Sequence, residues 1–328
     1  MHAMVLPALG RPLEWQELPD LEPQADEVRV EVLACGVCRT DLHVIDGELN
    51  HPTFPIIPGH EIVGRIDALG TGVHNGLKLG DRVGIPWLAD TCGCCSFCVH
   101  GHENLCDSPQ FTGYTRNGGF ATAAVAKARY ALPLPEAYSH DFLAPLLCAG
   151  LIGYRALTKT HSAQQLGIYG FGAAAHIVTQ IAKWQGRNVY AFTRQGDVRA
   201  QAFARKMGAN WSGTSGEMPP VALDAAVIFA PAGELVVQAL QALRKGGRVV
   251  CAGIHMSSIP SFPYELLWEE REIVSVANLT RQDGLDFLSG VADWGLNVTT
   301  SCYPLREANQ ALADLRAGRY DGAAVLIP

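Results

Sequence analysis

The chain has 328 residues, with 25 Lys and Arg against 32 Asp and Glu, which gives a formal net charge of −7. This length exceeds what one hydrophobic core usually serves, so two domains are expected. The acidic balance disfavours nucleic acid as a partner. No run of about 18 apolar residues is present, and the N-terminus lacks the basic and apolar segments of a signal peptide. We therefore expect a cytoplasmic protein with no membrane partner.

The first 150 residues or so contain short β-type runs interrupted by Gly and Pro. Examples are residues 28–37, 61–70 and 81–87, which are rich in Val and Ile. Runs of this kind with turn residues between them are typical of a twisted antiparallel barrel. The sequence thus predicts a β-rich first domain.

Within this part, residues 91–106 crowd five cysteines into one loop. Thiols stay reduced in the cytoplasm, so the crowding indicates a metal rather than disulfides. Four thiolates complete a tetrahedral shell without an open position, which predicts a structural Zn²⁺ that does not bind substrate. The spacing C-x2-C-x2-C-x7-C selects as its ligands Cys92, Cys95, Cys98 and Cys106.

Two alternatives remain open for this loop. Cys94 is expected to be a bystander, but a shifted register would use it as a ligand. The loop could also be a zinc ribbon that binds nucleic acid, which the acidic balance and the long βα pattern after it disfavour.

From about Gln164 onward, apolar strand candidates alternate with helix candidates. Strands separated by helices of this length predict βαβ units and a parallel, doubly wound sheet. The tail, residues 308–328, is expected to form one helix and one strand that return to the first domain. The strand candidates are residues 165–170, 188–193, 223–230, 247–253 and 272–278, and the helix candidates are 174–185, 197–208 and 233–247.

A glycine loop follows the first strand of this α/β part. Gly170 permits a tight turn, Gly172 lets the backbone approach a pyrophosphate, and Ala175 lets helix and strand pack closely. The helix N-terminus then faces the phosphates. Because the pattern lies on a strand-to-helix junction within βαβ units, it predicts a dinucleotide site.

The end of the second strand bears on the choice of cofactor. NAD-binding proteins commonly place a carboxylate there for the ribose hydroxyl. This chain has Thr193 and Arg194 instead, and Asp197 comes too late. Since these two side chains can hold a 2′-phosphate, we expect NADP(H) rather than NAD(H), although Arg194 could instead stack on adenine or face water.

Three separated segments of the chain supply candidates for a second metal site. They contribute Cys38 or Cys35, His60 with Glu61, and Cys148. Two thiolates and one imidazole form a shell of three protein ligands, whose fourth position can take a substrate oxygen. Each residue alone is more typical of an ordinary core position, but their joint occurrence with a dinucleotide loop favours a catalytic Zn²⁺.

These residues carry a resemblance. The motif Gly59-His60-Glu61-x2-Gly64-x5-Gly70-x2-Val73 resembles the zinc signature of zinc-dependent alcohol dehydrogenases of the medium-chain dehydrogenase/reductase superfamily, and the similarity covers essentially the whole chain. It implies a GroES-like catalytic domain over residues 1–148, a Rossmann domain over 149–278 and a returning segment over 279–328. It also assigns Cys38 rather than Cys35 as a ligand of the catalytic zinc, with His60 and Cys148.

The resemblance further implies roles for the neighbours of the ligands. Thr40 and His43 would relay the alcohol proton to solvent through the cofactor ribose, and imidazole suits the outer end because its usual pKa lies near neutrality. Asp41 would orient a ligand, and Glu61 would lie behind the metal. Arg39 would contact the cofactor pyrophosphate.

Other positions resemble the family pattern less completely. Trp87 lies where related enzymes place an aromatic wall of the alcohol pocket, although an ordinary core role is the alternative. Ile152 stands where the family often has Thr beside the nicotinamide. Near the C-terminus, Gly322 and Ala323 occupy the place of a basic residue that touches phosphate. The chain keeps the groups that hydride transfer requires. These departures lower the expected affinity for the cofactor.

The expected function is hydride transfer between an alcohol and a nicotinamide cofactor, with the aldehyde or ketone as substrate in reverse. One alternative is a zinc-independent enone or quinone reductase on the same scaffold, which would need neither cysteine cluster. Another is a noncatalytic zinc- and dinucleotide-binding redox sensor, which would need no proton relay. By analogy with the family, a homodimer or homotetramer is expected.

Overall fold

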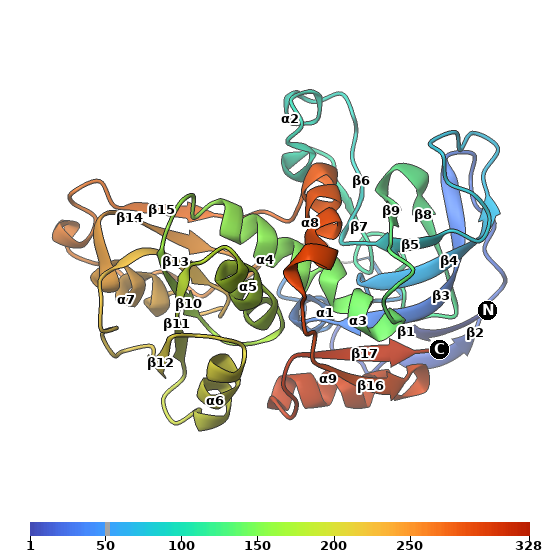
Figure 1. Ribbon diagram of the computed structural model, residues 1–328. Helices are drawn as coiled ribbons and strands as arrows, with labels where there is room; N and C mark the ends of the chain where they lie inside the picture. Colours follow the sequence, from blue (N-terminus) through green and yellow to red (C-terminus); the bar gives the residue numbers. More distant parts are fainter. Residues whose placement is uncertain (50–52) are drawn as a thin grey trace. The chain divides into compact units, whose positions relative to one another are not determined.

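The computed structural model describes residues 1–49 and 53–328. The chain forms two compact units, shown in Figure 1. The first unit comprises Met1–Ala149, Asn278–Leu288 and Val298–Pro328, and the second comprises Gly150–Ala277 and Ser289–Asn297. Residues 289–297 thus belong to the second unit, whereas the residues on both sides of them belong to the first.

The first unit is built on a seven-stranded sheet with the order β16-β17-β3-β4-β5-β9, in which β8 also pairs with β3. The pairing is antiparallel except between β16 and β17. Irregularities in the register of β3 against β4 bend the sheet. The strands are β3 (Glu27–Val37), β4 (Ile62–Leu69), β5 (Arg82–Ile85), β8 (Ala123–Lys127), β9 (Leu132–Pro133), β16 (Thr300–Pro304) and β17 (Ala323–Ile327), and two smaller sheets pair β1 (His2–Val5) with β2 (Glu14–Glu17) and β6 (Leu88–Asp90) with β7 (Gln110–Phe111).

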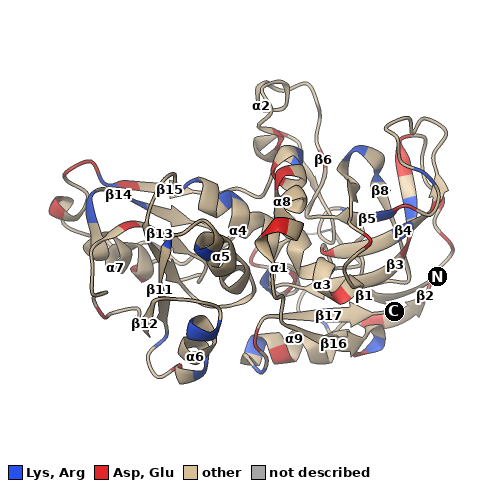
Figure 2. Ribbon diagram, viewed as in Figure 1, with Lys and Arg blue, Asp and Glu red and all other residues tan. Residues whose placement is uncertain are grey.

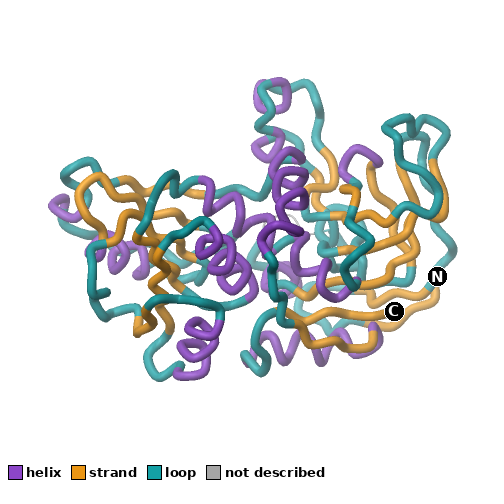
Figure 3. The backbone as a smooth tube through the Cα atoms, in the orientation of Figure 1, coloured by secondary structure: helices purple, strands orange, loops and turns teal. Residues whose placement is uncertain are grey.

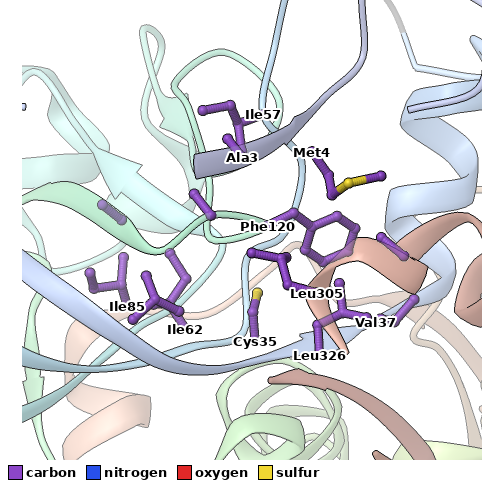
Figure 4. Packing of buried hydrophobic residues seen from close by; sticks show 14 of the residues in the cluster. Ala3, Met4, Cys35, Val37, Ile57, Ile62, Ile85, Phe120, Leu305 and Leu326 are labelled. Atoms are coloured by element: carbon purple, nitrogen blue, oxygen red, sulfur yellow. The ribbon is translucent and has the colours of Figure 1, made fainter. Parts of the chain in front are cut away.

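Strand β3 forms the middle of this unit because its side chains alternate. Val28, Val30 and Val32 are buried, whereas Glu31 between them is exposed. These valines join apolar side chains of β1, β4, β5, β8 and β17 in one core. Figure 4 shows the fully buried Phe120 in this core, with Met4 and Leu305 close to its ring. The core provides the rigid base on which the loops of the unit are carried.

Helices of the first unit are short and lie at the ends of strands. They are α1 (Arg39–Asp46), α2 (Ser96–Val99), α3 (His140–Leu143), the first part of α8 (Arg281–Trp294), α9 (Ala308–Ala317) and the 3-10 turns η1 (Glu103–Leu105), η2 (Ala128–Tyr130), η3 (Ala144–Leu147) and η5 (Leu305–Glu307). Helix α9 packs against α1, and the strand after it, β17, pairs with β3. The predicted helix and strand of the tail are thus present in the first unit.

The second unit has a six-stranded parallel sheet with the order β12-β11-β10-β13-β14-β15. The chain starts in the middle and winds outward in both directions, which is the doubly wound Rossmann order. Helices α5 and α6 lie on one face and α7 on the other (Figures 1 and 3). The elements are β10 (Gln165–Tyr169), β11 (Asn188–Thr193), β12 (Trp211–Thr214), β13 (Leu223–Ile228), β14 (Leu243–Cys251), β15 (Glu272–Ser275), α4 (Ala149–Thr158), α5 (Ala173–Trp184), α6 (Val198–Lys206), α7 (Glu234–Ala242) and η4 (Tyr264–Leu266).

One boundary of the second unit differs from the prediction. Helix α7 ends at Ala242, five residues before the predicted end at residue 247, and β14 already begins at Leu243. The cause is tertiary, since Leu243 pairs with Leu223 of β13 and is buried, which overrides the helix preference of the following Arg and Lys residues.

Charged residues of both signs are distributed over both units, as Figure 2 shows. In the described ranges no single helix is long and apolar enough to cross a membrane, whereas one bent pair, His140–Leu147 with Ala149–Thr158, reaches the length and composition together.

Candidate active site and metal centres

The first unit brings together four side chains from distant parts of the chain. Ligand atoms of Cys38, His60, Glu61 and Cys148 all lie within 4.8 Å of one another. Cys38 precedes α1, His60 and Glu61 precede β4, and Cys148 follows η3. The two sulfur atoms are 3.7 Å apart. The chain fold therefore assembles a possible metal centre that no local spacing encodes.

The two thiols of this centre are hydrogen-bonded to each other. The hydrogen bond from Cys148 lowers the pKa of Cys38 well below its usual range, although burial acts in the opposite direction. The same hydrogen bond, together with burial, raises the pKa of Cys148. Thiolate is the form of cysteine that binds metal, so Cys38 is prepared for that task by its surroundings.

Asp41 holds His60 in a defined orientation. Its Oδ1 accepts a hydrogen bond from His60 Nδ1 at 3.1 Å, and Oδ2 accepts one from the backbone N–H of Cys38 at 2.8 Å. Burial opposes the charged form of His60, but Asp41 and Cys38 outweigh it and raise the pKa of the imidazole well above its usual range. His60 Nε2 is buried without a hydrogen-bond partner among the described residues. An imidazole held at Nδ1 with Nε2 left for a metal is the usual arrangement of a histidine ligand.

Glu61 lies beside this centre in a fully enclosed position. It is 2 % exposed, and its Oε2 has no hydrogen-bond partner in the described part of the chain. Burial raises the pKa of this carboxyl well above its usual range. A Cβ atom at Gly36 would lie 1.7 Å from Glu61 Oε2, so glycine is required there to leave room for the carboxyl group.

Cys35, which the residues alone left as an alternative to Cys38, lies elsewhere. Its side chain is 1 % exposed and belongs to the apolar core of the first unit, where it contacts the carbonyl oxygen of Gly36 at 3.6 Å. Burial raises the pKa of this thiol well above its usual range. The structure thus groups Cys38 with His60, and Cys35 with the core.

Residues expected to form a proton relay lie on α1, close to the centre. Thr40 Oγ1 is 3.7 Å from Cys38 Sγ. His43 is buried, and its Nδ1 is in direct hydrogen-bond contact with Glu48 Oε2. Arg39, at the first position of α1, is exposed. Glu48 was not identified from the sequence, because a single acidic residue after a helix gives no signal of its partner.

An aromatic stack adjoins the imidazole of His60. The Trp87 ring contacts the His60 ring edge-on at 5.0 Å, and it stacks on Phe111 at 5.1 Å and on Tyr114 at 5.8 Å. Trp87 is 6 % exposed. Trp87 therefore lies beside the metal centre, as expected, and also belongs to the apolar core of the first unit. Phe111 and Tyr114 were not identified from the sequence, since their approach to Trp87 depends on β7 and the loop after it.

The four-cysteine loop forms a second candidate metal centre in the first unit. Sulfur atoms of Cys92, Cys95, Cys98 and Cys106 lie within 4.8 Å of one another, and Cys94 is exposed and outside the group. Backbone N–H groups donate to these sulfurs, and those of Cys94 and Cys95 lower the pKa of Cys92 to about 6. The chemistry of the donor set, four sulfurs with backbone donors, fits a structural zinc.

Neighbouring side chains tie this loop to the rest of the first unit. Thr91 Oγ1 and the Tyr130 hydroxyl form a buried hydrogen bond of 2.7 Å. Arg129 donates to the carbonyl oxygen of Thr91 at 2.5 Å. Glu103, within the loop, accepts hydrogen bonds from the backbone and side chain of Arg281 at 3.0 and 3.1 Å. Both ends of the loop are thereby anchored.

In the second unit the glycine loop joins β10 to α5. Gly170 has a φ of +87°, and a Cβ atom there would lie 2.9 Å from the Cβ of Ala230, so the turn needs glycine. Apart from its neighbours in the chain, no described residue has an atom within 4 Å of the Cβ position of Gly172, which leaves the N-terminus of α5 open to a phosphate. Ala175 is fully buried under the sheet–helix contact. These features fit the pyrophosphate of a dinucleotide.

The end of β11 carries the residues expected to select the cofactor. Thr193 is 4 % exposed, and its hydroxyl lies 3.5 Å from the carbonyl oxygen of Gly213 and 3.3 Å from Gln201 Nε2. Arg194 is exposed. Asp197 caps the N-terminus of α6 by accepting from the backbone N–H of Ala200 at 3.0 Å, so its carboxylate has a structural partner. Of the two predicted phosphate contacts, Arg194 is the accessible one.

An open cluster of two cysteines and one histidine on a β-barrel unit, in a chain that also forms a Rossmann unit, defines the class of zinc-dependent medium-chain dehydrogenases. Residues 24–136 match the alcohol dehydrogenase GroES-like domain. The chain is 46% identical over 312 residues to the probable alcohol dehydrogenase AdhA of Mycobacterium tuberculosis, covering 93% of this chain and 90% of that protein. It is 35% identical over 337 residues to an alcohol dehydrogenase of Moraxella sp., covering 99% of each. The chain belongs to the alcohol dehydrogenase family.

Solved structures agree with this assignment. A cinnamyl alcohol dehydrogenase from Sorghum bicolor superimposes with a TM-score of 0.91 at 27% identity, over 99% of this chain and 97% of that one. The alcohol dehydrogenase of Aeropyrum pernix gives a TM-score of 0.88 at 27% identity, over 100% of both chains. The predicted family, fold class and activity as a zinc-dependent, NAD(P)-dependent alcohol oxidoreductase are confirmed.

Proposed function

We propose that Cys38, His60 and Cys148 hold a catalytic zinc and that the four-cysteine loop holds a structural zinc, two ions per chain. The observation that carries the first assignment is His60 Nε2, which is buried and unpartnered among the described residues while two sulfurs lie within 4.8 Å. Leaving such a nitrogen unmatched is costly unless a ligand takes its lone pair. Counting zinc tests the assignment, because the intact enzyme should hold two ions and a His60→Ala variant one.

The residues around the centre divide the work of alcohol oxidation. A zinc ion held by these residues would supply Lewis acidity toward the alcohol oxygen, and a nicotinamide cofactor held by the second unit would supply the hydride acceptor. Asp41 fixes His60 so that Nε2 keeps its direction, and Thr40 accepts the alcohol proton at its hydroxyl. His43 takes that proton onward to solvent. The low exposure of Trp87 and Tyr114 keeps water away from one side of the centre.

A zinc-independent enone or quinone reductase on the same scaffold is not favoured. Such an enzyme has no use for a buried imidazole held toward two thiols, nor for four cysteines gathered in one loop. A noncatalytic sensor would likewise not need a proton relay through Thr40 and His43.

Arg194 supports a preference for NADP(H) over NAD(H). It is an exposed guanidinium at the end of β11, where the sequence has no carboxylate to repel a 2′-phosphate. A solved structure of CAD from Helicobacter pylori complexed with NADP(H), at 21% identity, supports the fold alone. Gly170, Gly172 and Ala175 would hold the pyrophosphate of either cofactor.

Replacing Arg194 with Asp should reverse this preference. Charge-assisted hydrogen bonds contribute about 1.5–3 kcal/mol, so the ratio of kcat/KM for NADP over NAD should fall by about 10- to 100-fold. Initial rates with both cofactors measure this ratio. Arg205→Asp is the matched control, because Arg205 lies near the end of α6 and bonds Ser212 at 2.5 Å. An unchanged ratio in Arg194→Asp would dismiss the cofactor assignment.

We further propose that two copies of the chain associate through β15, as a dimer alone or as half of a tetramer. Strand β15 is at the edge of its sheet, paired on one side with β14. The segment before it exposes apolar side chains, including Tyr264 at 66 % and Trp268 at 59 %. An open edge beside an apolar patch is suited to a symmetric, self-complementary contact.

Trp268→Lys should therefore weaken the assembly to monomers at micromolar concentration, as measured by sedimentation velocity. Trp184→Lys is the control, because Trp184 is equally exposed, at 58 %, but lies on α5. An assembly that resists the first change and dissociates with the second would place the contact elsewhere.

The predicted domain ranges of 1–148, 149–278 and 279–328 and the cytoplasmic location remain predictions.

A further inference from the structure

We propose that Glu48 is a positioning residue of the proton relay, which holds the imidazole of His43 through Nδ1. The inference rests on the proposed function, in which His43 is the outer member of the relay. Its basis is the direct contact between His43 Nδ1 and Glu48 Oε2, at a histidine whose side chain is 10% exposed.

The end of α1 brings Glu48 back toward His43. Gly47 ends the helix in the left-handed region with a φ of 74°, and the chain reverses there. The backbone N–H of Glu48 then donates to the carbonyl oxygen of His43 at 2.9 Å. A Cβ atom at position 47 would lie 2.6 Å from Leu9 Cδ1, so the turn leaves little room for another residue. Glu48 is thus fixed to His43 by its backbone as well as by its carboxylate.

This contact decides which nitrogen of His43 handles the relayed proton. A carboxylate is an acceptor only, so His43 Nδ1 carries the hydrogen and Nε2 carries the lone pair. In the proposed relay the proton from Thr40 reaches Nε2 through the cofactor ribose, and the carboxylate compensates the charge of the imidazolium that results. The imidazolium then loses a proton to solvent and returns to the same tautomer.

The other charged groups near the end of α1 have different partners. Asp46 forms two hydrogen bonds with Arg316 of α9, at 2.7 and 2.8 Å. Arg316 also faces Glu48 electrostatically from α9, and Arg39 lies at the opposite end of α1. From the N-terminal segment the neighbour is the apolar Leu9. Asp46 is therefore a matched control for Glu48. It lies at the same end of α1, but its carboxylate bonds an arginine rather than a residue of the relay.

The experiment compares Glu48→Gln, Glu48→Asp, Asp46→Asn and His43→Ala in the zinc-loaded enzyme. Glu48→Gln should lower kcat by about 10-fold with KM for the alcohol unchanged, as expected when a partner of a catalytic group is lost. Glu48→Asp should recover most of the rate, and Asp46→Asn should behave as the unmodified enzyme. Added amine buffers should restore the rate of Glu48→Gln, because a soluble base replaces the relay.

Two further measurements separate positioning from a general structural role. In the double variant His43→Ala with Glu48→Gln, the second change should have no additional effect on kcat. The strongly downfield proton resonance of His43 Nδ1–H should be present in the unmodified enzyme and absent in Glu48→Gln.

If His43→Ala lowers kcat and Glu48→Gln has normal kcat, the inference is overturned and the proposed relay stands. If His43→Ala itself has normal kcat, the relay in the proposed function fails, and the role of Glu48 with it. Additive effects in the double variant, or an Nδ1–H resonance that survives Glu48→Gln, also overturn the inference.

Discussion

Replacing His60 with Ala should remove one of two zinc ions and lower kcat/KM for alcohol oxidation by about 10³-fold or more. The imidazole is the nitrogen ligand of the proposed catalytic centre, and its Nε2 is buried beside the sulfurs of Cys38 and Cys148. Loss of the ion removes several kcal/mol of stabilisation of the developing negative charge, and each 1.36 kcal/mol is a factor of ten in rate. Elemental analysis and initial rates on the same preparation measure both effects.

Cys148→Ala should give the same result, because it removes a sulfur ligand of the same centre, which lies directly after η3. The matched control is Cys35→Ala, which removes a buried thiol of the core that lies outside the cluster. This control should keep two zinc ions and normal turnover, at a modest cost in stability from the small cavity. Retention of both ions and of activity in His60→Ala would exclude the proposed catalytic centre.

Cys106→Ser should remove the other zinc and strongly destabilise the first unit. The loop buries little apolar surface of its own, since Phe97, Val99 and Leu105 are exposed at 39 %, 63 % and 43 %. Binding of a structural zinc contributes on the order of 10 kcal/mol in small zinc domains. Even a third of that value would lower Tm by about 6–12 °C in a protein of this size, by the usual conversion of 2–4 °C per kcal/mol. Thermal unfolding followed by circular dichroism measures the shift.

The control for this variant is Cys94→Ser. Cys94 is exposed and lies outside the group of four sulfurs, so its loss should leave two zinc ions and a Tm within about 1 °C, as for an ordinary surface change. A Cys94 variant that loses zinc while Cys106→Ser keeps it would establish the shifted register instead.

The two metal centres differ in how far sequence alone determines them. Cys92, Cys95 and Cys98 are close in the chain, so their spacing predicts the cluster before any fold is known. The residues alone leave Cys38 and Cys35 as alternatives, and the pairing of β3 with β4 and β17 separates them. Cys35 pairs with Leu326 and enters the core, whereas Cys38 comes after the strand, at the start of α1.

Contacts that depend on packing gave no sequence signal. Glu48 meets His43 only because Gly47 reverses the chain, and Tyr114 meets Trp87 only because Gly113 lies close against Gly59, where a Cβ atom would be 2.8 Å from the Gly59 nitrogen. The parallel, doubly wound sheet of the second unit was expected from the alternation of strands and helices, since the period of the apolar residues is local information. The predicted end of α7 at residue 247 was wrong. The helix stops earlier because Leu243 pairs with β13, a strand that is distant in the sequence.

Anomalous diffraction at the zinc edge, on crystals of the zinc-loaded enzyme, would locate both metal ions. Two peaks per chain are expected. One is surrounded by the four sulfurs of the loop, and the other lies about 2.3 Å from the sulfurs of Cys38 and Cys148 and about 2.0–2.1 Å from His60 Nε2. A single peak in the four-cysteine loop, with no zinc between Cys38, His60 and Cys148 in an active enzyme, would contradict the proposed catalytic centre.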